Sequence, residues 1–334
     1  MNKVLEKHVQ DFMNYKRNSL SGEYAGGKNC LRLFLSYTSI HFPFDELPTK
    51  DSVLSFLSEH ESKPGSLYGY SVIMREFSKY LILNGYKEAY LLPSNYTVQP
   101  TPKPPYYLDS NSINSFFQAV DHIEAFPKNA HSQYREIIFP ALYRMMYCCG
   151  TRDIEMIRLK CEDVHLEKRY FDILESKGYR SRRVFMSEEV NTYMLNYHQT
   201  ISVLVPDRIF FFPSTSTIQN RQKTKAVSKP CLEQEFETCW KKAFPDFDWN
   251  EGDHPTPYDF RHHFAYANLN RWTEEGKDIN VMLPYLMRYM GHESVSETLY
   301  YFHFVPSFFG TYNNIVKQLN DSVIPEVYDN EKDT

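Results

Sequence analysis

The chain lacks the features that mark secreted, membrane and dithiol redox proteins. Its six cysteines show neither a C-x-x-C pair nor the spacing of a disulfide framework, so we expect reduced, buried thiols. No apolar run is long enough to span a bilayer, and the polar N-terminal residues do not read as a signal peptide. Internal repeats and low-complexity segments are also missing. We therefore expect a cytoplasmic protein without a membrane partner.

The chain also lacks an excess of positive charge. Its formal net charge is -5 and its pI is near 6.2, which argues against an indiscriminately basic nucleic-acid binder. The basic residues are nevertheless grouped at 177–183 and again at 221–229, while acidic residues collect in 321–334. A solvated loop is the alternative interpretation of the second basic group.

Length and proline placement predict two domains. The chain has 334 residues and 42% hydrophobic content, enough for two cores. Five prolines in 93–107 exclude regular helix or central strand there, so this stretch is the expected linker. Before it, residues 1–92 form the expected helical domain. Its helical patterns lie at 3–17, 24–38, 51–59 and 65–84. After it, we expect a larger domain over 108–320 and a disordered acidic tail over 321–334.

Sequence signals for the ends of helices and strands in the larger domain predict where several polar side chains lie. Gly150 follows an apolar helix, so Arg152 is expected at the start of the next helical turn, with Glu155 on the same face. The β-prone runs 170–174 and 183–186 predict a hairpin with Lys177 near its tip.

Two further helices are expected downstream. Thr256 and Pro257 predict a helix start, which would put Tyr258 and Arg261 on one face. Gly291 should end an apolar helix just before His292. A capping box at 294–297 should then open a helix that contains or just precedes Tyr301.

Tyr301, Arg152, Arg261 and Lys177 together suit phosphoryl transfer. A free tyrosine has a pKa near 10, so only about one molecule in a thousand is the phenolate at pH 7 and the group needs help to attack. Two arginines can hold the oxygens of a phosphodiester, while a lysine or histidine handles protons. That division of work requires no metal.

Each of these residues also has a purely structural interpretation. Tyr301 could be a hydrogen-bonded core tyrosine, the arginines could be surface ion-pair partners, and Lys177 could be a solvated hairpin residue. His292 could be a cation at a helix C-terminus. The histidines at 254, 262 and 263 do not form a metal motif, because adjacent helical side chains diverge and no cysteine lies at ligand spacing.

Five boxes in order resemble the tyrosine recombinases of the phage-integrase and Xer type, over about residues 108 to 305. The matched positions are Gly150, Arg152, Glu155, Leu159, Asp163, Lys177, Arg261, His262, Gly291, His292, Tyr301 and His303. One position departs from the pattern. The family most often has histidine where this chain has Tyr258, and a phenol is a poor proton shuttle near neutral pH.

The resemblance implies a mainly α protein of the DNA breaking-rejoining type, with a helical, SAM-like core-DNA-binding domain and a mostly α catalytic domain bearing a small antiparallel β-sheet. It implies a site-specific DNA recombinase or integrase that cuts and rejoins DNA through a 3'-phosphotyrosyl intermediate, without metal, ATP or another cofactor. Expected partners are double-stranded DNA at specific recombination sites, further copies of the chain in a tetramer on paired sites, and an accessory directionality factor. A bacterial, phage or mobile-element setting, including transposition, fits this activity.

The residue roles that follow fall into three groups. The expected catalytic residues are Tyr301 as nucleophile, Arg152, Lys177, Tyr258, Arg261 and His292. The expected supporting residues are Glu155, His262 and His303. The expected DNA-binding residues are Arg75, Lys79, Arg180, Arg182, Arg183, Arg221, Lys223 and Lys225.

Two other activities remain open, as does the position of the last helix. A type IB topoisomerase or telomere resolvase would use the same chemistry, and a catalytically silent DNA-binding regulator would use the same scaffold. The apolar stripe within 308–319 predicts a helix that packs either on its own domain or on a neighbouring protomer.

Overall fold

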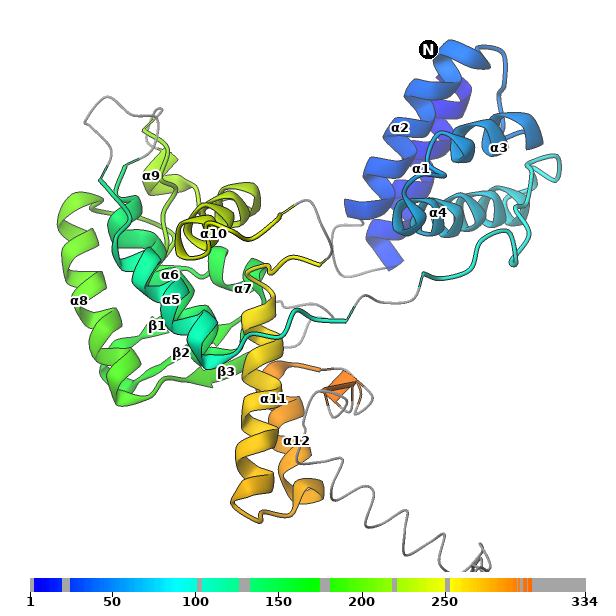
Figure 1. The fold of residues 1–334 in the computed structure, drawn as a ribbon. Coiled ribbons are helices and arrows are strands. Elements are labelled where there is room, and N and C mark those ends of the chain that lie inside the picture. Colours follow the sequence, from blue (N-terminus) through cyan, green and yellow to red (C-terminus); the bar gives the residue numbers. More distant parts are fainter. Residues whose placement is uncertain are drawn as a thin grey trace, which may run out of the picture. The chain divides into compact units, whose positions relative to one another are not determined.

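The computed structural model describes residues 3–19, 25–100, 104–125, 133–174, 181–217, 221–249, 253–292, 294, 297–298 and 300–301. The chain divides into two compact units, Met1–Pro104 and Pro105–Thr334 (Figure 1). Their boundary falls within the proline-rich stretch. In the described ranges, no helix combines the length and the apolar character that a membrane crossing needs.

The first unit is a bundle of four helices. They are α1 (Lys3–Ser19), α2 (Ala25–His41), α3 (Lys50–Ser58) and α4 (Pro64–Leu83). Buried aromatic rings at Phe12, Phe34, Phe56 and Phe77 fill the space between them. Arg75 on α4 donates hydrogen bonds to the carbonyl oxygens of Leu92 and Pro93, at 3.1 and 2.8 Å. These bonds attach the segment after α4 to the bundle.

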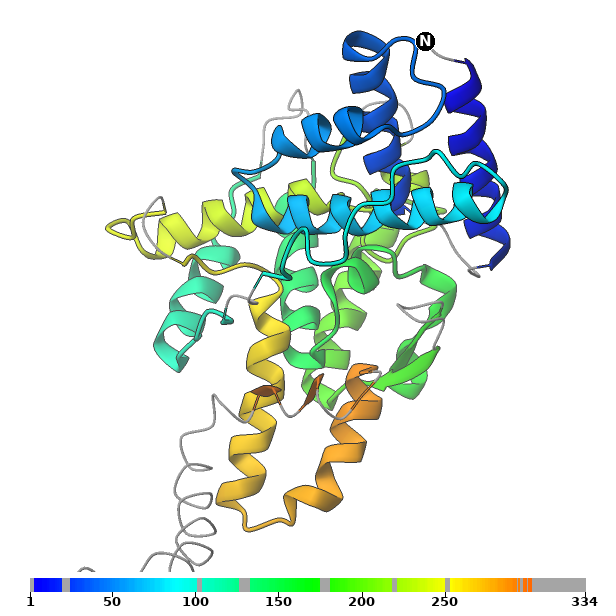
Figure 2. The ribbon, with the colours of Figure 1, turned by 90° about the vertical axis from the view of Figure 1, so that its right-hand side faces the viewer.

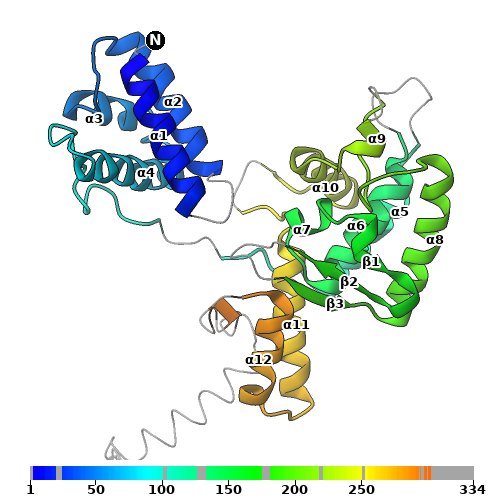
Figure 3. The ribbon, with the colours of Figure 1, turned by 180° about the vertical axis from the view of Figure 1, so that it is seen from behind.

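The second unit combines eight helices with one small sheet in the described ranges. The helices are α5 (Ser110–Asp121), α6 (Arg135–Cys149), α7 (Asp153–Ile157), α8 (Glu188–Leu204), α9 (Arg221–Thr224), α10 (Lys229–Ala243), α11 (Asp259–Glu274) and α12 (Ile279–Met290). The antiparallel sheet has the order β1 (Val164–His165), β2 (Tyr170–Ile173) and β3 (Arg182–Phe185) (Figure 3). The fold class predicted from the sequence is confirmed.

The central helix α6 fixes the start of α11. Its buried side chains pack against α5, α8 and α11. Tyr143 of α6 and Phe116 of α5 lie against Phe260, with ring centroids 6.3 and 5.6 Å apart respectively. Because Phe260 is locked into this aromatic core, the orientation of the next residue, Arg261, is also fixed.

α11 and α12 form an antiparallel helical hairpin with a small core of its own (Figure 2). Leu269, Trp272, Leu286 and Met290 are buried between the two helices, and Tyr301 belongs to the same cluster. The sequence prediction for the start of α11 was wrong. The helix begins at Asp259 with Tyr258 as its N-cap, because the Asp259 carboxylate accepts hydrogen bonds from the backbone and hydroxyl of Thr256.

The cysteine prediction holds in part. All six are free thiols. Burial raises the pKa of Cys30 and Cys239 to about 12. Cys161 and Cys231 are half-buried and Cys148 is exposed, so the expectation of burial was wrong at Cys148.

Candidate active site

Arg152 lies between the end of α6 and the start of α7, as the sequence predicted. α6 ends at Gly150, whose φ of 58° is left-handed, and Arg152 is the N-cap of α7. Its Nη1 donates to Glu155 Oε1 at 2.8 Å and its Nη2 to the carbonyl oxygen of Gly291 at 2.9 Å. Arg152 therefore links the start of α7 to the end of α12.

Arg261 is a buried cation held by carbonyl oxygens. Its side chain is 1% exposed, and its Nη1 and Nη2 donate to the carbonyl oxygens of Gly150 at 2.8 Å and Met290 at 2.7 Å. Both carbonyls lie at helix C-termini, where the helix dipole is negative. Its Nε is buried without a partner, and Arg261 forms no ion pair with a carboxylate within the described ranges. Burial, and then the nearby charge of Arg152, lowers the pKa of Arg261.

Such a guanidinium is an incomplete anion site. Two carbonyl dipoles offset only part of one full charge, and the buried Nε–H still lacks an acceptor. A phosphate near this guanidinium would supply the remaining negative charge.

Tyr301 lies in this charged environment. It is 4% exposed, and its hydroxyl oxygen lies 3.1 Å from Nδ1 of His262. The His292 ring stacks on its other side, with centroids 5.9 Å apart and planes at 14°. Burial raises the pKa of Tyr301, and the positive charge of Arg261 partly opposes that shift. The DNA-free protein therefore holds Tyr301 as the phenol.

The two histidines beside Tyr301 are neutral at pH 7. Burial and then Arg261 lower the pKa of His262 to about 4. Burial, Arg261 and Arg152 lower the pKa of His292 to about 3. Nδ1 of His292 lies 2.7 Å from the Thr298 hydroxyl, so Nε2 is the ring nitrogen left for a substrate. Thr298 was not among the predicted site residues, because a threonine at this position belongs to no sequence motif.

Tyr258 remains at the edge of the site. It is 36% exposed, and its ring meets His262 edge to face, with centroids 4.9 Å apart. Its partial exposure leaves the phenol open to solvent and to a ligand.

Two expected DNA-binding arginines are engaged inside the protein. Arg182 is 7% exposed and donates to Glu155 Oε1 and Oε2 at 2.9 and 2.7 Å, and to the Tyr289 carbonyl at 2.8 Å. The side chain of Arg182 is bonded to protein groups here, and its expected contact with DNA stays a prediction. Arg75 is likewise committed to the backbone carbonyls that follow α4. For both arginines the sequence shows a positive charge but does not show which protein groups accept its hydrogen bonds.

The other expected DNA-binding residues lie nearer the surface. Arg183 is half-exposed, pairs with Asp172 at 2.9 Å and stacks over Tyr170. Lys79, Arg221 and Lys225 are exposed, and Lys223 is partly exposed. Lys177, Arg180 and His303, together with the expected helix in 308–319 and the tail, lie outside the described residues.

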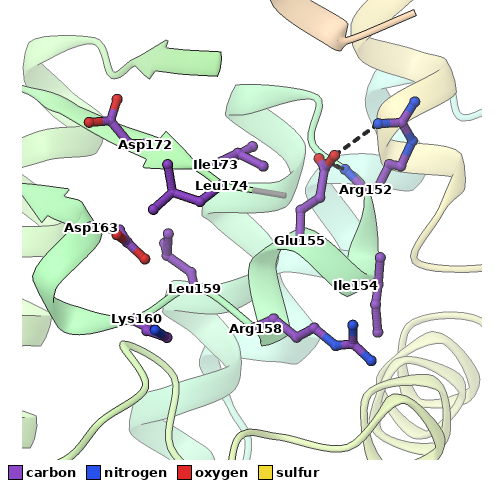
Figure 4. Close-up of a pocket in the computed structure, with 10 residues that line it drawn as sticks. All are labelled: Arg152, Ile154, Glu155, Arg158, Leu159, Lys160, Asp163, Asp172, Ile173 and Leu174. Atoms are coloured by element: carbon purple, nitrogen blue, oxygen red, sulfur yellow. Dashed lines mark hydrogen bonds and ion pairs between the residues drawn. The ribbon is translucent and has the colours of Figure 1, made fainter. Parts of the chain in front are cut away.

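A cavity of about 320 Å³ borders the Arg152–Glu155 pair (Figure 4). Its far side is lined by Asp163, Asp172 and Leu174. Tyr301, Arg261 and His292 do not line it, so the cavity lies beside the candidate site and is not the site itself. No cluster of three or more histidine, cysteine or acidic side chains suited to a metal occurs in the described parts of the chain.

Known proteins resemble this chain in sequence along most of its length. The chain is 24% identical to the tyrosine recombinase XerA of Pyrococcus furiosus over 82% of this chain and 83% of that protein. It is 21% identical to the tyrosine recombinase XerD of Staphylococcus saprophyticus, over 91% and 94% respectively.

Solved structures share the fold. XerH site-specific recombinase, in a post-cleavage complex with difH substrate, matches with a TM-score of 0.57 at 18% identity, over 86% of this chain and 78% of that chain. A lambda integrase tetramer bound to a Holliday junction matches with a TM-score of 0.57 at 14% identity, over 88% and 76%. The model of the phage integrase family matches residues 107–306, which is more than half of this chain. The chain therefore belongs to the phage integrase family of tyrosine recombinases.

Proposed function

We propose that this chain is a site-specific DNA recombinase that cuts and rejoins DNA through a covalent bond between Tyr301 and a 3'-phosphate. One observation carries the proposal. The buried Tyr301 hydroxyl lies within the field of Arg261 and Arg152, and Arg261 keeps a buried Nε–H without an acceptor. A buried tyrosine hydroxyl close to two arginine side chains suits attack on a phosphodiester.

In this proposal, each residue has a defined task. Arg152 and Arg261 hold the non-bridging oxygens, while His292 Nε2 and the Tyr258 hydroxyl donate hydrogen bonds to the phosphate. Lys177 protonates the departing 5' oxygen. Since one phosphodiester is exchanged for another of similar energy, the reaction requires neither ATP nor a metal and runs in both directions.

The proposal also covers the assembly of the protein on DNA. Paired recombination sites would bring together four copies of the chain, with double-stranded DNA held by Lys79, Arg183 and the basic residues of α9. The lambda integrase tetramer on a Holliday junction supports this arrangement by its similar fold. Direction would come from an accessory factor or from asymmetry of the sites. The proposed compartment is the cytoplasm.

The decisive experiment maps covalent protein–DNA adducts on the DNA that flanks the gene. A nicked duplex that loses its short 5' strand after cleavage traps the adduct. Tyr301→Phe should remove the adduct and leave DNA binding nearly unchanged, because only the attacking oxygen is lost. The neighbouring Tyr300→Phe is the matched control and should still cleave. If Tyr300→Phe abolishes cleavage and Tyr301→Phe does not, the assignment of the nucleophile is wrong.

A further inference from the structure

One imidazole nitrogen lies in hydrogen-bond contact with the oxygen that would attack the phosphate. Nδ1 of His262 is 3.1 Å from the Tyr301 hydroxyl. The His292 ring lies slightly farther from the Tyr301 ring, with centroids 5.9 Å apart against 5.5 Å for His262. Its plane is nearly parallel to that ring, and its Nδ1 is bonded to the Thr298 hydroxyl. In the described part of the chain, His262 is thus the side chain bonded to this oxygen.

Resting on the proposed function, we propose that His262 is a catalytic residue that accepts the proton of Tyr301 during attack. The Tyr301 O–H bond breaks, the proton moves to His262 Nδ1, and the oxygen's electron pair forms the new bond to phosphorus. The bond from phosphorus to the 5' oxygen breaks, and that oxygen takes its proton from Lys177. In the reverse reaction, the His262 imidazolium returns its proton to Tyr301.

The position of His262 on α11 supports this role. It directly follows Arg261, whose guanidinium is locked by the carbonyls of Gly150 and Met290, so the backbone that carries the imidazole is fixed. The Tyr258 ring packs edge-on against the imidazole. Tyr258 itself is a phenol and would be a poor proton acceptor at neutral pH.

A bound phosphate should make His262 a stronger base, because it changes the net charge near the imidazole. The groups that surround it are Arg261 on its own helix, Tyr258 at the helix start, and Tyr301 and His292 from the segment after α12. In the DNA-free protein, burial and Arg261 lower the pKa of His262, which keeps the ring neutral and able to accept a proton. A bound phosphate offsets the charge of Arg261, so it raises the pKa of His262 and makes it a stronger base.

The test uses the full chain and a nicked duplex that carries the mapped cleavage position. His262→Asn keeps a hydrogen-bonding group near Tyr301 but cannot take up a proton. We expect adduct formation at saturating DNA to slow by about 100-fold or more, the usual contribution of general acid–base catalysis. His262→Gln provides a second variant if the asparagine chain is unstable. His263→Asn is the matched control, because His263 contacts Leu108 and Tyr266 instead, and it should cleave at the wild-type rate.

A chemical rescue separates proton transfer from positioning. Replacing Tyr301 with 3,5-difluorotyrosine lowers the phenol pKa, so loss of its proton depends less on a base. The substitution should recover most of the lost rate in the His262→Asn chain and change the wild-type rate little. A His262→Asn chain that cleaves like wild type would overturn the proposal, as would failure of the rescue while DNA binding is intact. Absence of any adduct from the wild-type chain would instead overturn the proposed function, and this inference with it.

Discussion

Arg182 on β3 donates two hydrogen bonds to the carboxylate of Glu155 on α7, at 2.9 and 2.7 Å. The same carboxylate accepts from the side chain and the backbone of Arg152. One buried anion thus holds two arginines and connects the sheet to the candidate site. Gly291 must be small here, because a Cβ would lie 2.9 Å from Nη1 of Arg182.

Removing the charge of Glu155 should therefore destabilise the second unit. In Glu155→Gln, an amide N–H₂ would face two guanidinium groups, and breaking a buried ion pair in this way costs about 3–5 kcal/mol. All three tryptophans lie at 240, 249 and 272, so denaturant unfolding followed by tryptophan fluorescence reports on this unit. Glu233→Gln changes a half-exposed ion pair with Lys229 and should cost less than about 1 kcal/mol. Equal losses in the two variants would contradict the assigned role of Glu155.

Two glycines with the same backbone conformation should respond differently to alanine. Gly150 and Gly276 have φ of 58° and 65°, so each substitution carries left-handed strain of about 1–2 kcal/mol. A Cβ at Gly150 would overlap the ring of Phe264, whereas nothing lies within 4 Å at Gly276. Gly150→Ala should lose about 1–3 kcal/mol more stability than Gly276→Ala. It should also slow adduct formation, since the Gly150 carbonyl holds Arg261. Similar cleavage rates for the two variants would show that this carbonyl does not position Arg261.

Thr298 should act through His292. Thr298→Val keeps the shape but leaves Nδ1 of a buried histidine without its partner, which costs about 1–3 kcal/mol. The imidazole also loses the group that directs Nε2 toward a phosphate, so the cleavage rate should fall by about tenfold or more. Thr298→Ser keeps the hydroxyl and should restore the rate. A slow serine variant with normal stability would indicate that the methyl group, not the hydrogen bond, matters.

The buried histidines should make the second unit sensitive to mild acid. The pKa of His292 is lowered to about 3 from an ordinary value near 6.5. Below pH 6.5 the unfolded chain binds a proton that the folded chain does not, so stability falls as the pH drops. The loss from this histidine is about 1.4 kcal/mol per pH unit between pH 6 and 4.5. His292→Asn should flatten the pH dependence of tryptophan-monitored unfolding, while His122→Asn, at an exposed position, should not. An unchanged slope in His292→Asn would refute the assignment.

Lys177 is predicted to protonate the departing 5' oxygen. A 5' bridging sulfur leaves without a proton, so Lys177→Ala should cleave normal DNA slowly and the sulfur-substituted strand at nearly the wild-type rate. Equal impairment on the two substrates would remove Lys177 from this role.

Local signals in the sequence predict the order and the ends of most elements around the site. Gly150 and Gly291 end α6 and α12 because their left-handed conformation favours glycine, and Asp109 caps α5 through a hydrogen bond to the Ser112 backbone. These signals depend on neighbouring residues and can be read without tertiary contacts. The same kind of reasoning failed at Thr256, since the Asp259 carboxylate competes for its hydroxyl.

The contacts of the charged side chains follow from tertiary packing and have no signal in the local sequence. Arg182 and Arg183 are adjacent on one strand, so they point to opposite faces of the sheet. Arg182 is buried against Glu155, while Arg183 remains half-exposed beside Asp172. The partners of Arg261 come from the ends of α6 and α12, 111 and 29 residues away in sequence. Such contacts depend on how helices pack, and the same packing brings His262 to the Tyr301 hydroxyl and Thr298 to His292.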